Sequence, residues 1–175
     1  MNEKKRNFIL KSTYKAIKKR IAVIREKLTN EIPKILRETY DSDGYWHDNA
    51  PWQEALREQQ MLNQELYSLV DALKDVSFIE DMYFLCDKDK VTVGKSIEIK
   101  DIVTKKSTEY SVVGSLDVVY NPNSKKYRFL SCKTPFAKSL LGKSVGERMT
   151  VKLPGGTKVF LISEIKPLTI LSKAK

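Results

Sequence analysis

The hydrophobic positions of the N-terminal part of the chain repeat with the period of an α-helix. They follow one another at steps of three and four residues, which places them in a narrow stripe along one side of a helix. The members of this stripe are Tyr14, Ile17, Ile21, Ile24, Leu28, Ile32 and Ile35. Two successive steps of four interrupt the seven-residue repeat, and Pro33 removes a backbone donor. We therefore expect a long helix that bends near Ile32.

A second stripe with the same spacing follows at Ala55, Leu62, Leu66, Leu69, Leu73 and Val76. Its start is marked by Asp48, Asn49 and Pro51, because Asp or Asn caps a helix and proline fits the first turn. Two such narrow stripes can only be buried against each other. The pattern predicts an antiparallel two-helix coiled coil over residues 1–76, with arms roughly 40 Å long and a tip loop at residues 40–50.

After Val76 the hydrophobic period shortens toward two, which is typical of strands. We expect strands at residues 82–86, 91–93, 96–104, 110–120, 127–130, 149–153 and 159–165. One helix interrupts them, because Thr134 can cap it, Pro135 fits its first turn and Gly142 can close it. Residues 77–175 are thus predicted to form a separate antiparallel β domain of five or six strands with one short helix, and the fold class is α+β.

The charge is distributed unevenly along the chain. The formal net charge is +10, and residues 1–40 contain 12 Lys and Arg against 4 Asp and Glu. Residues 41–50 contain no basic residue and three aspartates. Because a strong positive excess favours polyanionic partners, the basic first arm is expected to lie beside nucleic acid or a nucleoprotein machine.

Composition excludes several classes of protein. No apolar run of about 18 residues is present, and the charged N-terminus lacks the apolar stretch of a secretory signal. We therefore expect a cytoplasmic protein without a membrane partner. One histidine and two cysteines without metal-ligand spacing leave little for a zinc site or a Cys-His catalytic pair. Cys86 and Cys132 are interpreted as reduced thiols of the core.

The predicted tip loop, YDSDGYWHDNAPW, allows two interpretations. Asp41, Asp43 and Asp48 are ordinary turn and cap residues in the first. In the second they recruit a metal, because Mg²⁺ is commonly held by one or two carboxylates together with oxygens of a substrate. The aromatic residues Tyr45, Trp46 and Trp52 either dock on a partner or fold back on the helices. The residues alone leave these alternatives open.

Three motifs in the C-terminal half carry a family resemblance. They are YSVVG at residues 110–114, SCKTPFAKSLLGKSVGE at residues 131–147 and VKLPGG at residues 151–156. With the preceding helical hairpin, they make the chain resemble the bacterial Gre-family transcription elongation factors. The resemblance implies an FKBP-like C-terminal domain that grips the rim of the secondary channel of bacterial RNA polymerase. The implied polymerase contacts are Ser131, Thr134, Pro135 and Ala137.

The same resemblance implies a role for the tip. The tip of cleavage-competent family members resembles the motif Gly-Asp-x-x-Glu-Asn-Ala-x-Tyr. At the corresponding positions this chain has Tyr45 in place of the Asp and Asp48 in place of the Glu. Asp41 or Asp43 would have to supply the missing carboxylate. Asp41, Asp43, Asp48 and Asn49 are thus the implied catalytic residues. Asp43 and Asp48 would bind metal only together with the polymerase, whose active site supplies the Mg²⁺, and the chain alone is expected to hold no cofactor.

The basic first arm would then run beside the nascent RNA transcript. The residues expected to lie near the RNA are Lys18, Lys19, Arg20, Arg25, Lys27, Lys34 and Arg37. The main hypothesis is an elongation factor that stimulates transcript cleavage by the polymerase without being an enzyme itself, and that acts as a monomer. The alternative is a Gre-like regulator or inhibitor that occupies the channel without supporting cleavage. An independent prolyl isomerase and a free nucleic-acid-binding protein are the remaining alternatives.

Overall fold

The computed structural model describes residues 7–42, 49–82, 89–153 and 156–168. The chain divides into two compact units. The helical unit is Lys15–Lys74, and the β unit combines Met1–Tyr14 with Asp75–Lys175. None of the helices in the described part of the chain is both long enough and apolar enough to cross a membrane.

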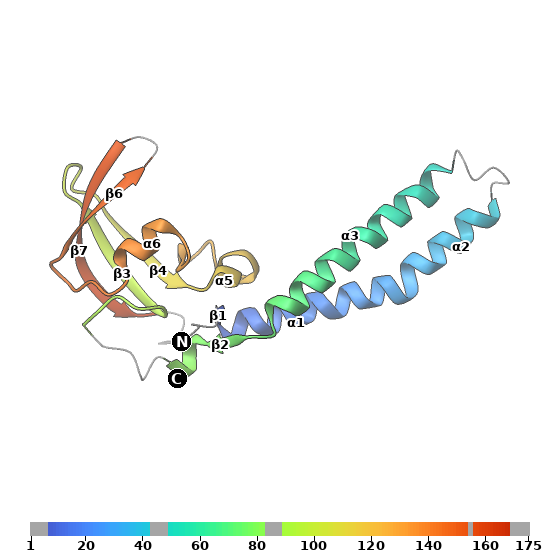
Figure 1. The fold of residues 1–175 in the computed structure, drawn as a ribbon, viewed down its shortest axis with the longest axis horizontal. Coiled ribbons are helices and arrows are strands. Elements are labelled where there is room, and N and C mark those ends of the chain that lie inside the picture. The colour runs from blue at the N-terminus through green and yellow to red at the C-terminus, as the bar shows by residue number, and fades with distance from the viewer. Residues whose placement is uncertain (1–6, 43–48, 83–88, 154–155, 169–175) are drawn as a thin grey trace, which may run out of the picture. The chain divides into compact units, whose positions relative to one another are not determined.

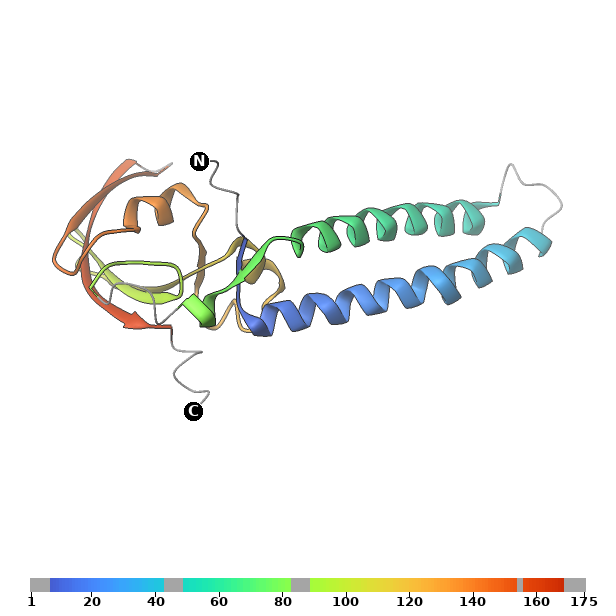
Figure 2. The same cartoon turned by 60° about the horizontal axis from the view of Figure 1, so that its bottom comes forward.

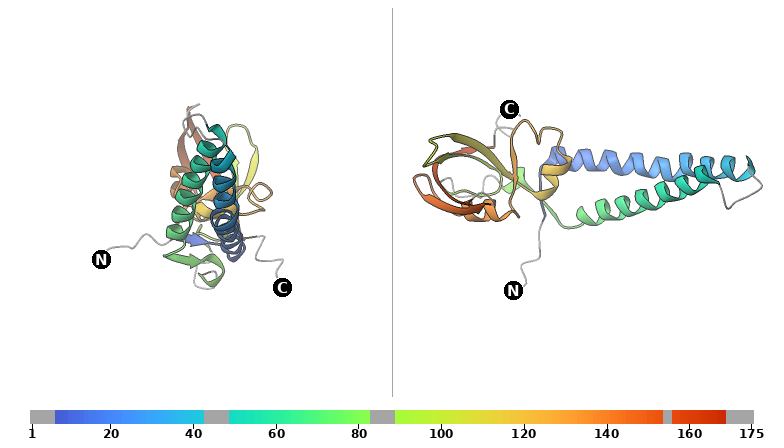
Figure 3. Two further views of the ribbon diagram at one scale, coloured as in Figure 1. Left: turned by 90° about the vertical axis from the view of Figure 1, so that its right-hand side faces the viewer. Right: turned by 90° about the horizontal axis from the view of Figure 1, so that it is seen from above.

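The helical unit contains two antiparallel arms. The first arm is α1 (Lys11–Glu26), whose first four residues belong to the β unit, followed by the π-helical segment η1 (Lys27–Glu31) and α2 (Ile32–Ser42). The second arm is α3 (Ala50–Ala72). The arms lie side by side in all views (Figure 1, Figure 2, Figure 3). Arg20 pairs with Glu65 at 2.8 Å and Lys27 pairs with Glu58 at 3.3 Å. Because residue numbers rise in one arm as they fall in the other, the arms are antiparallel, as predicted.

The predicted irregularity near Ile32 is a π-helical turn. The Ile32 N–H donates to the Lys27 carbonyl, five residues earlier. A π turn holds one residue more than an α turn, so it accommodates the extra residue in the two successive steps of four. Pro33 is the second residue of α2, where the loss of its N–H is tolerated. The helix therefore restarts at Ile32 and does not end there.

Most of the two predicted stripes is buried between the arms. Ile17, Ile21, Ile24, Ile32, Ala55, Leu62 and Leu69 are buried. Ile35 is an exception, because its side chain is 39% exposed. A helix turns by about 100° per residue, so Leu36 at i+4 from Ile32 takes the more enclosed position. The prediction for Val76 is also wrong, since Val76 begins a strand after the helix has ended.

The β unit begins with a small sheet that the sequence analysis missed. β1 (Asn7–Ile9) pairs in parallel with β2 (Val76–Phe78), in the register Phe8 opposite Ser77. This pairing joins the N-terminal residues to the β unit. The units therefore divide at 14/15 and 74/75, whereas the sequence prediction placed all of residues 1–76 in the hairpin.

The main sheet has five strands in the order β5-β4-β3-β7-β6. The strands are β3 (Lys95–Asp101), β4 (Ser107–Val113), β5 (Phe129–Ser131), β6 (Arg148–Leu153) and β7 (Gly156–Pro167). β5 is parallel to β4, so the sheet is mixed and the prediction of a purely antiparallel sheet is wrong. The reason is the crossover connection through α5 (Ser115–Tyr120), which returns the chain to β4 at Ser111, so that β5 runs in the same direction as β4.

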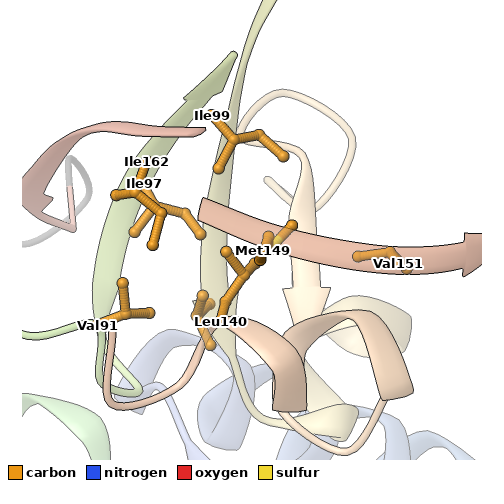
Figure 4. Close-up of a cluster of buried hydrophobic side chains, with 8 residues drawn as sticks. Val91, Ile97, Ile99, Leu140, Met149, Val151 and Ile162 are labelled. Carbon is orange, nitrogen blue, oxygen red and sulfur yellow. The ribbon is translucent and has the colours of Figure 1, made fainter. Parts of the chain in front are cut away.

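The core of the β unit lies between this sheet and α6 (Pro135–Leu140). Figure 4 shows its buried side chains, which include Ile97, Ile162, Leu140 and Met149. Thr134 caps α6 through a hydrogen bond from the Ala137 N–H at 3.1 Å, and Pro135 occupies its first turn, as predicted. Cys132 is a half-buried free thiol that packs against this core, whereas Cys86 lies outside the described residues.

Several predicted strands differ from the structure. Residues 91–93 form no strand, because the Val91 N–H and carbonyl instead bond to Lys143 and Gly142. Met82 ends the helix α4 (Ile79–Met82), and the rest of the predicted strand 82–86 is outside the described residues. The predicted strand 110–120 stops at Val113, and its second half is α5. The β unit consequently contains more than the one short helix expected.

Candidate functional site

The predicted tip is only partly covered by the structure. Asp41 lies in the last turn of α2, and Asn49 directly precedes α3. Asp43 and Asp48 lie outside the described residues. Within the described part of the chain, no group of three or more Asp, Glu, His and Cys residues is arranged to hold a metal ion. The assignment of Asp43 and Asp48 as metal ligands therefore stays a prediction.

Asn49 has a structural role that its predicted catalytic assignment did not include. It is the N-cap of α3, and its Oδ1 accepts a hydrogen bond from the Trp52 N–H at 3.0 Å. Its Nδ2 donates to the Thr39 carbonyl at 2.6 Å. The side chain is buried and links the end of α2 to the beginning of α3. Asn49 thus fixes the two helix ends from which the loop starts, and its predicted capping function is confirmed.

The members of the predicted basic row differ in their contacts. Arg20 makes a bidentate pair with Glu65, both contacts being 2.8 Å, and this neighbour lowers the pKa of Glu65. Lys27 bridges to α3 through Glu58, whereas Lys34 pairs within its own helix with Glu38 at 3.8 Å. Arg37 donates from Nε to the Pro33 carbonyl at 3.1 Å. Lys18, Lys19 and Arg25 have exposed side chains. Part of the row therefore joins the arms, and part faces solvent.

The predicted polymerase-contact residues lie together at the beginning of α6. Thr134 Oγ1 donates to the Ser131 carbonyl at 2.9 Å, and Ser131 Oγ accepts from the Lys133 N–H at 3.3 Å. Pro135 is exposed, and Ser131 and Thr134 are partly exposed. Ala137 is fully buried. Its methyl group belongs to the interior of the β unit, so the structure does not support the expected surface contact at this residue.

Sequence reasoning missed the buried carboxylate of Asp117. Its Oδ1 accepts from the Leu10 N–H and its Oδ2 from the Gly114 N–H, both at 3.0 Å. Burial raises the pKa of this carboxyl, whereas the hydrogen bonds to it act in the opposite direction. The spacing of Gly114 and Asp117 is that of an N-cap and an acceptor at the third helical position, which is the signal that could have predicted α5.

Comparisons with known proteins show what this chain is similar to. The family model described as "Transcription elongation factor, GreA/GreB, C-term" matches residues 86–167. Transcription elongation factor GreA of Nitratiruptor sp. is 31% identical over 147 residues, which cover 82% of this chain and 86% of that protein. GreA of Thermotoga neapolitana is 26% identical over 152 residues, covering 87% of this chain and 92% of that protein.

Among solved structures, the GreA factor homolog 1 (Gfh1) of Thermus thermophilus matches with a TM-score of 0.40 and 23% identity. The match covers 92% of this chain and 99% of Gfh1. The relatives are named as elongation factors and not as enzymes, which agrees with the prediction that the chain is not itself an enzyme. The identity and coverage of the GreA relatives establish that this chain belongs to the GreA/GreB family of transcription elongation factors.

Proposed function

We propose that this protein is an RNA polymerase-binding elongation factor whose helical hairpin enters the secondary channel of the enzyme. The observation that carries the proposal is the antiparallel pairing of the arms, from Arg20–Glu65 to the Asn49–Thr39 hydrogen bond. It supports a coiled coil that presents the residues between α2 and α3 at its far end. Family membership supports the polymerase as partner.

We assign the anchoring of the factor to the β unit, which we take to be FKBP-like. Pro135 and its neighbours Thr134 and Ser131 would contact the rim of the channel. Lys133 and Lys138 are exposed beside them and would add positive charge to that contact. Because Ala137 is buried, it is left out of the surface. The hydrogen bonds of Thr134 to Ser131 and Ala137 hold the turn in one conformation.

At the tip, Asp43 and Asp48 would supply carboxylate oxygens to the active site of a backtracked polymerase, with Asp41 as the other candidate. Carboxylates of this kind suit Mg²⁺, which when bound activates water and stabilises the phosphodiester oxygens. The polymerase would perform the cleavage, and the factor would lend ligands. Asn49 acts indirectly, since both polar ends of its amide already bond to the protein.

The exposed cations of α1 would contact the nascent RNA. Lys19 and Arg25 are the strongest candidates, because Arg20 and Lys27 already pair with glutamates of α3. Each phosphate contact contributes an electrostatic, salt-dependent term. This assignment divides the predicted row into residues that hold the hairpin together and residues that approach the transcript.

A channel-binding regulator without cleavage activity is the second candidate. The observation that favours it is Tyr45, which occupies the position of the Asp in the motif that cleavage-competent family members resemble. With one metal-directing carboxylate absent, the tip would still occupy the channel and obstruct it. The two candidates share the docking and differ only in the chemistry of the loop.

A cleavage assay on stalled, backtracked elongation complexes separates the candidates. We expect the wild-type protein to accelerate shortening of the labelled transcript, and Asp48→Ala and Asp43→Ala to lose this effect while still binding polymerase. Glu54→Ala, which removes an exposed carboxylate of α3, is the matched control and should retain activity. Inhibition of elongation without shortening would favour the regulator. Failure to bind polymerase would refute both candidates.

A further inference from the structure

The edge of β4 is only partly covered by its neighbouring strand. β3 pairs with β4 from Ser107 to Val112, but β5 pairs only from Ser111 to Val113. On the β5 side, the Ser111 N–H donates to the Arg128 carbonyl at 3.3 Å and the Val113 carbonyl accepts from Cys132. Main-chain groups of alternate residues point to the same side of a strand. Those of Ser107 and Glu109 therefore face the uncovered edge.

A pocket of about 350 Å³ lies at this uncovered edge. It is lined by Ser107, Thr108, Glu109, Lys126, Tyr127 and Arg128. The Tyr127 ring stacks on Phe129 at 6.4 Å, and the Lys126 ammonium lies 5.5 Å from its centroid. These contacts hold the segment opposite the edge in place. The pocket is thus bordered by a strand edge on one side and by a basic segment on the other.

The charge around the pocket favours an acidic ligand. Residues 118–146 contain six lysines and arginines and no acidic residue. Lys126 and Arg128 have exposed side chains. Glu109 is the acidic residue among those that line the pocket. Its side chain lies on the same face of the sheet as that of Glu98, its cross-strand partner. The segment facing the edge is therefore positive.

We propose that this edge binds an extended, acidic segment of a partner protein, which adds a strand to β4. Strand addition satisfies free main-chain groups of an edge, and side-chain charges next to the edge select the peptide. A nucleic acid fits less well, because phosphates cannot donate to the main-chain carbonyls at the edge. The Tyr127 ring is also already packed against Phe129 and Lys126. The inference is independent of the proposed action at the tip.

The experiment follows the amide resonances of the isotope-labelled full chain during titration with a short capped peptide of alternating glutamate and threonine. We expect shifts at Ser107, Glu109 and residues 126–128, and slower hydrogen exchange of the Glu109 amide. Reversal of Lys126 and Arg128 to glutamate should weaken binding about tenfold or more. The matched control reverses Arg148 on β6 and Lys158 on the neighbouring β7, at the other end of the sheet, and should bind as the wild type does.

A second variant tests the main-chain part of the proposal. Glu109→Pro removes the edge-facing N–H while leaving the bonds of β4 to β3 in place, because an edge strand tolerates proline there. Glu109→Ala retains that N–H and is its control. We expect Glu109→Pro to abolish peptide binding and Glu109→Ala to preserve it. Equal binding of a lysine-threonine peptide, or no shifts at the edge, would overturn the proposal. Binding of oligothymidine instead of the acidic peptide would assign the site to nucleic acid.

Discussion

At the residue scale, Gly114 and Asp117 decide how the N-terminal segment is attached to the β unit. A Cβ atom on Gly114 would lie 1.7 Å from the Phe8 carbonyl oxygen, so only glycine allows this close approach. Asp117 then accepts the N–H groups of Gly114 and Leu10. Asn121 completes the junction, since its Nδ2 donates to Thr13 Oγ1 at 2.7 Å. A few buried atoms thus hold β1 and the first turn of α1.

We predict that Gly114→Ala destabilises the protein by more than about 2 kcal/mol, because β1 must move to make room for the methyl group. Gly142→Ala is the control. It meets no atom within 4 Å, but its φ of +82° makes it cost about 1 kcal/mol through backbone strain alone. Chemical denaturation of both variants measures the difference. A smaller loss for Gly114→Ala than for Gly142→Ala would contradict the packing described for Phe8.

At the scale of elements, the hairpin arms are joined by burial along one stripe and by ion pairs at its border. The pair between Arg20 and Glu65 sets the register near the base of the arms, and that between Lys27 and Glu58 sets it next to the π turn. These pairs are partly exposed, so each contributes little to stability but excludes other registers. The register in turn determines which residue of α2 lies opposite Asn49, the N-cap of α3.

We predict that Arg20→Ala returns the pKa of Glu65 from its lowered value toward the ordinary 4.5. Because the pKa of the carboxyl is lower in the folded state, the pair stabilises the fold at pH values above the pKa of the unfolded state. This contribution is lost as the pH falls through the pKa of the folded state. The variant should accordingly be less stable by about 0.5 kcal/mol at neutral pH, with no difference in strong acid.

An NMR titration of the Glu65 carboxyl and denaturation at two pH values measure these effects. Lys34→Ala, which removes a pair within one helix, should leave the Glu65 pKa unchanged. An unchanged Glu65 pKa in Arg20→Ala would show that the arms do not pair in this register.

At the scale of the whole molecule, the β unit is built from two separated pieces of sequence. The Asn7 N–H donates to the Asp75 carbonyl at 3.0 Å, and the Tyr14 ring packs edge-on against Phe78 at 5.4 Å. Leu10 belongs to a buried cluster with Ile79, Val113 and Leu168. The residues before the hairpin therefore complete the fold of the residues after it.

We predict that residues 1–14 joined by a flexible glycine-serine linker to residues 75–175 fold cooperatively, whereas residues 77–175 alone are less stable by several kcal/mol. The shorter fragment loses β1 and with it the β2 pairing, it loses the Leu10 N–H that donates to Asp117, and it exposes the partners of Leu10. Thermal and chemical unfolding of both fragments provide the comparison. Equal stability would mean that the β unit does not need its N-terminal piece.

The sequence alone determined those elements whose signals are local. The apolar stripes predicted both arms and an irregularity near Ile32, and Asn49 with Pro51 predicted the cap, because helix periodicity and capping depend on residues a few positions apart. Thr134, Pro135 and Gly142 likewise defined α6. The C-terminal motifs predicted the family, and the GreA relatives confirmed it.

Only the tertiary structure decided the pairing of segments that are distant in sequence. Three-residue strands such as β1 and β5 carry no detectable period, so nothing local indicates their parallel partners. The apolar residues after Gly114 suit a strand by composition, but the chain forms a helix there, and the long-range hydrogen bond from the Leu10 N–H to Asp117 accompanies it. Burial of Ala137 is likewise a property of packing around α6. Local chemistry specified the helices and their caps, whereas long-range contacts specified the sheet and the surface it leaves free.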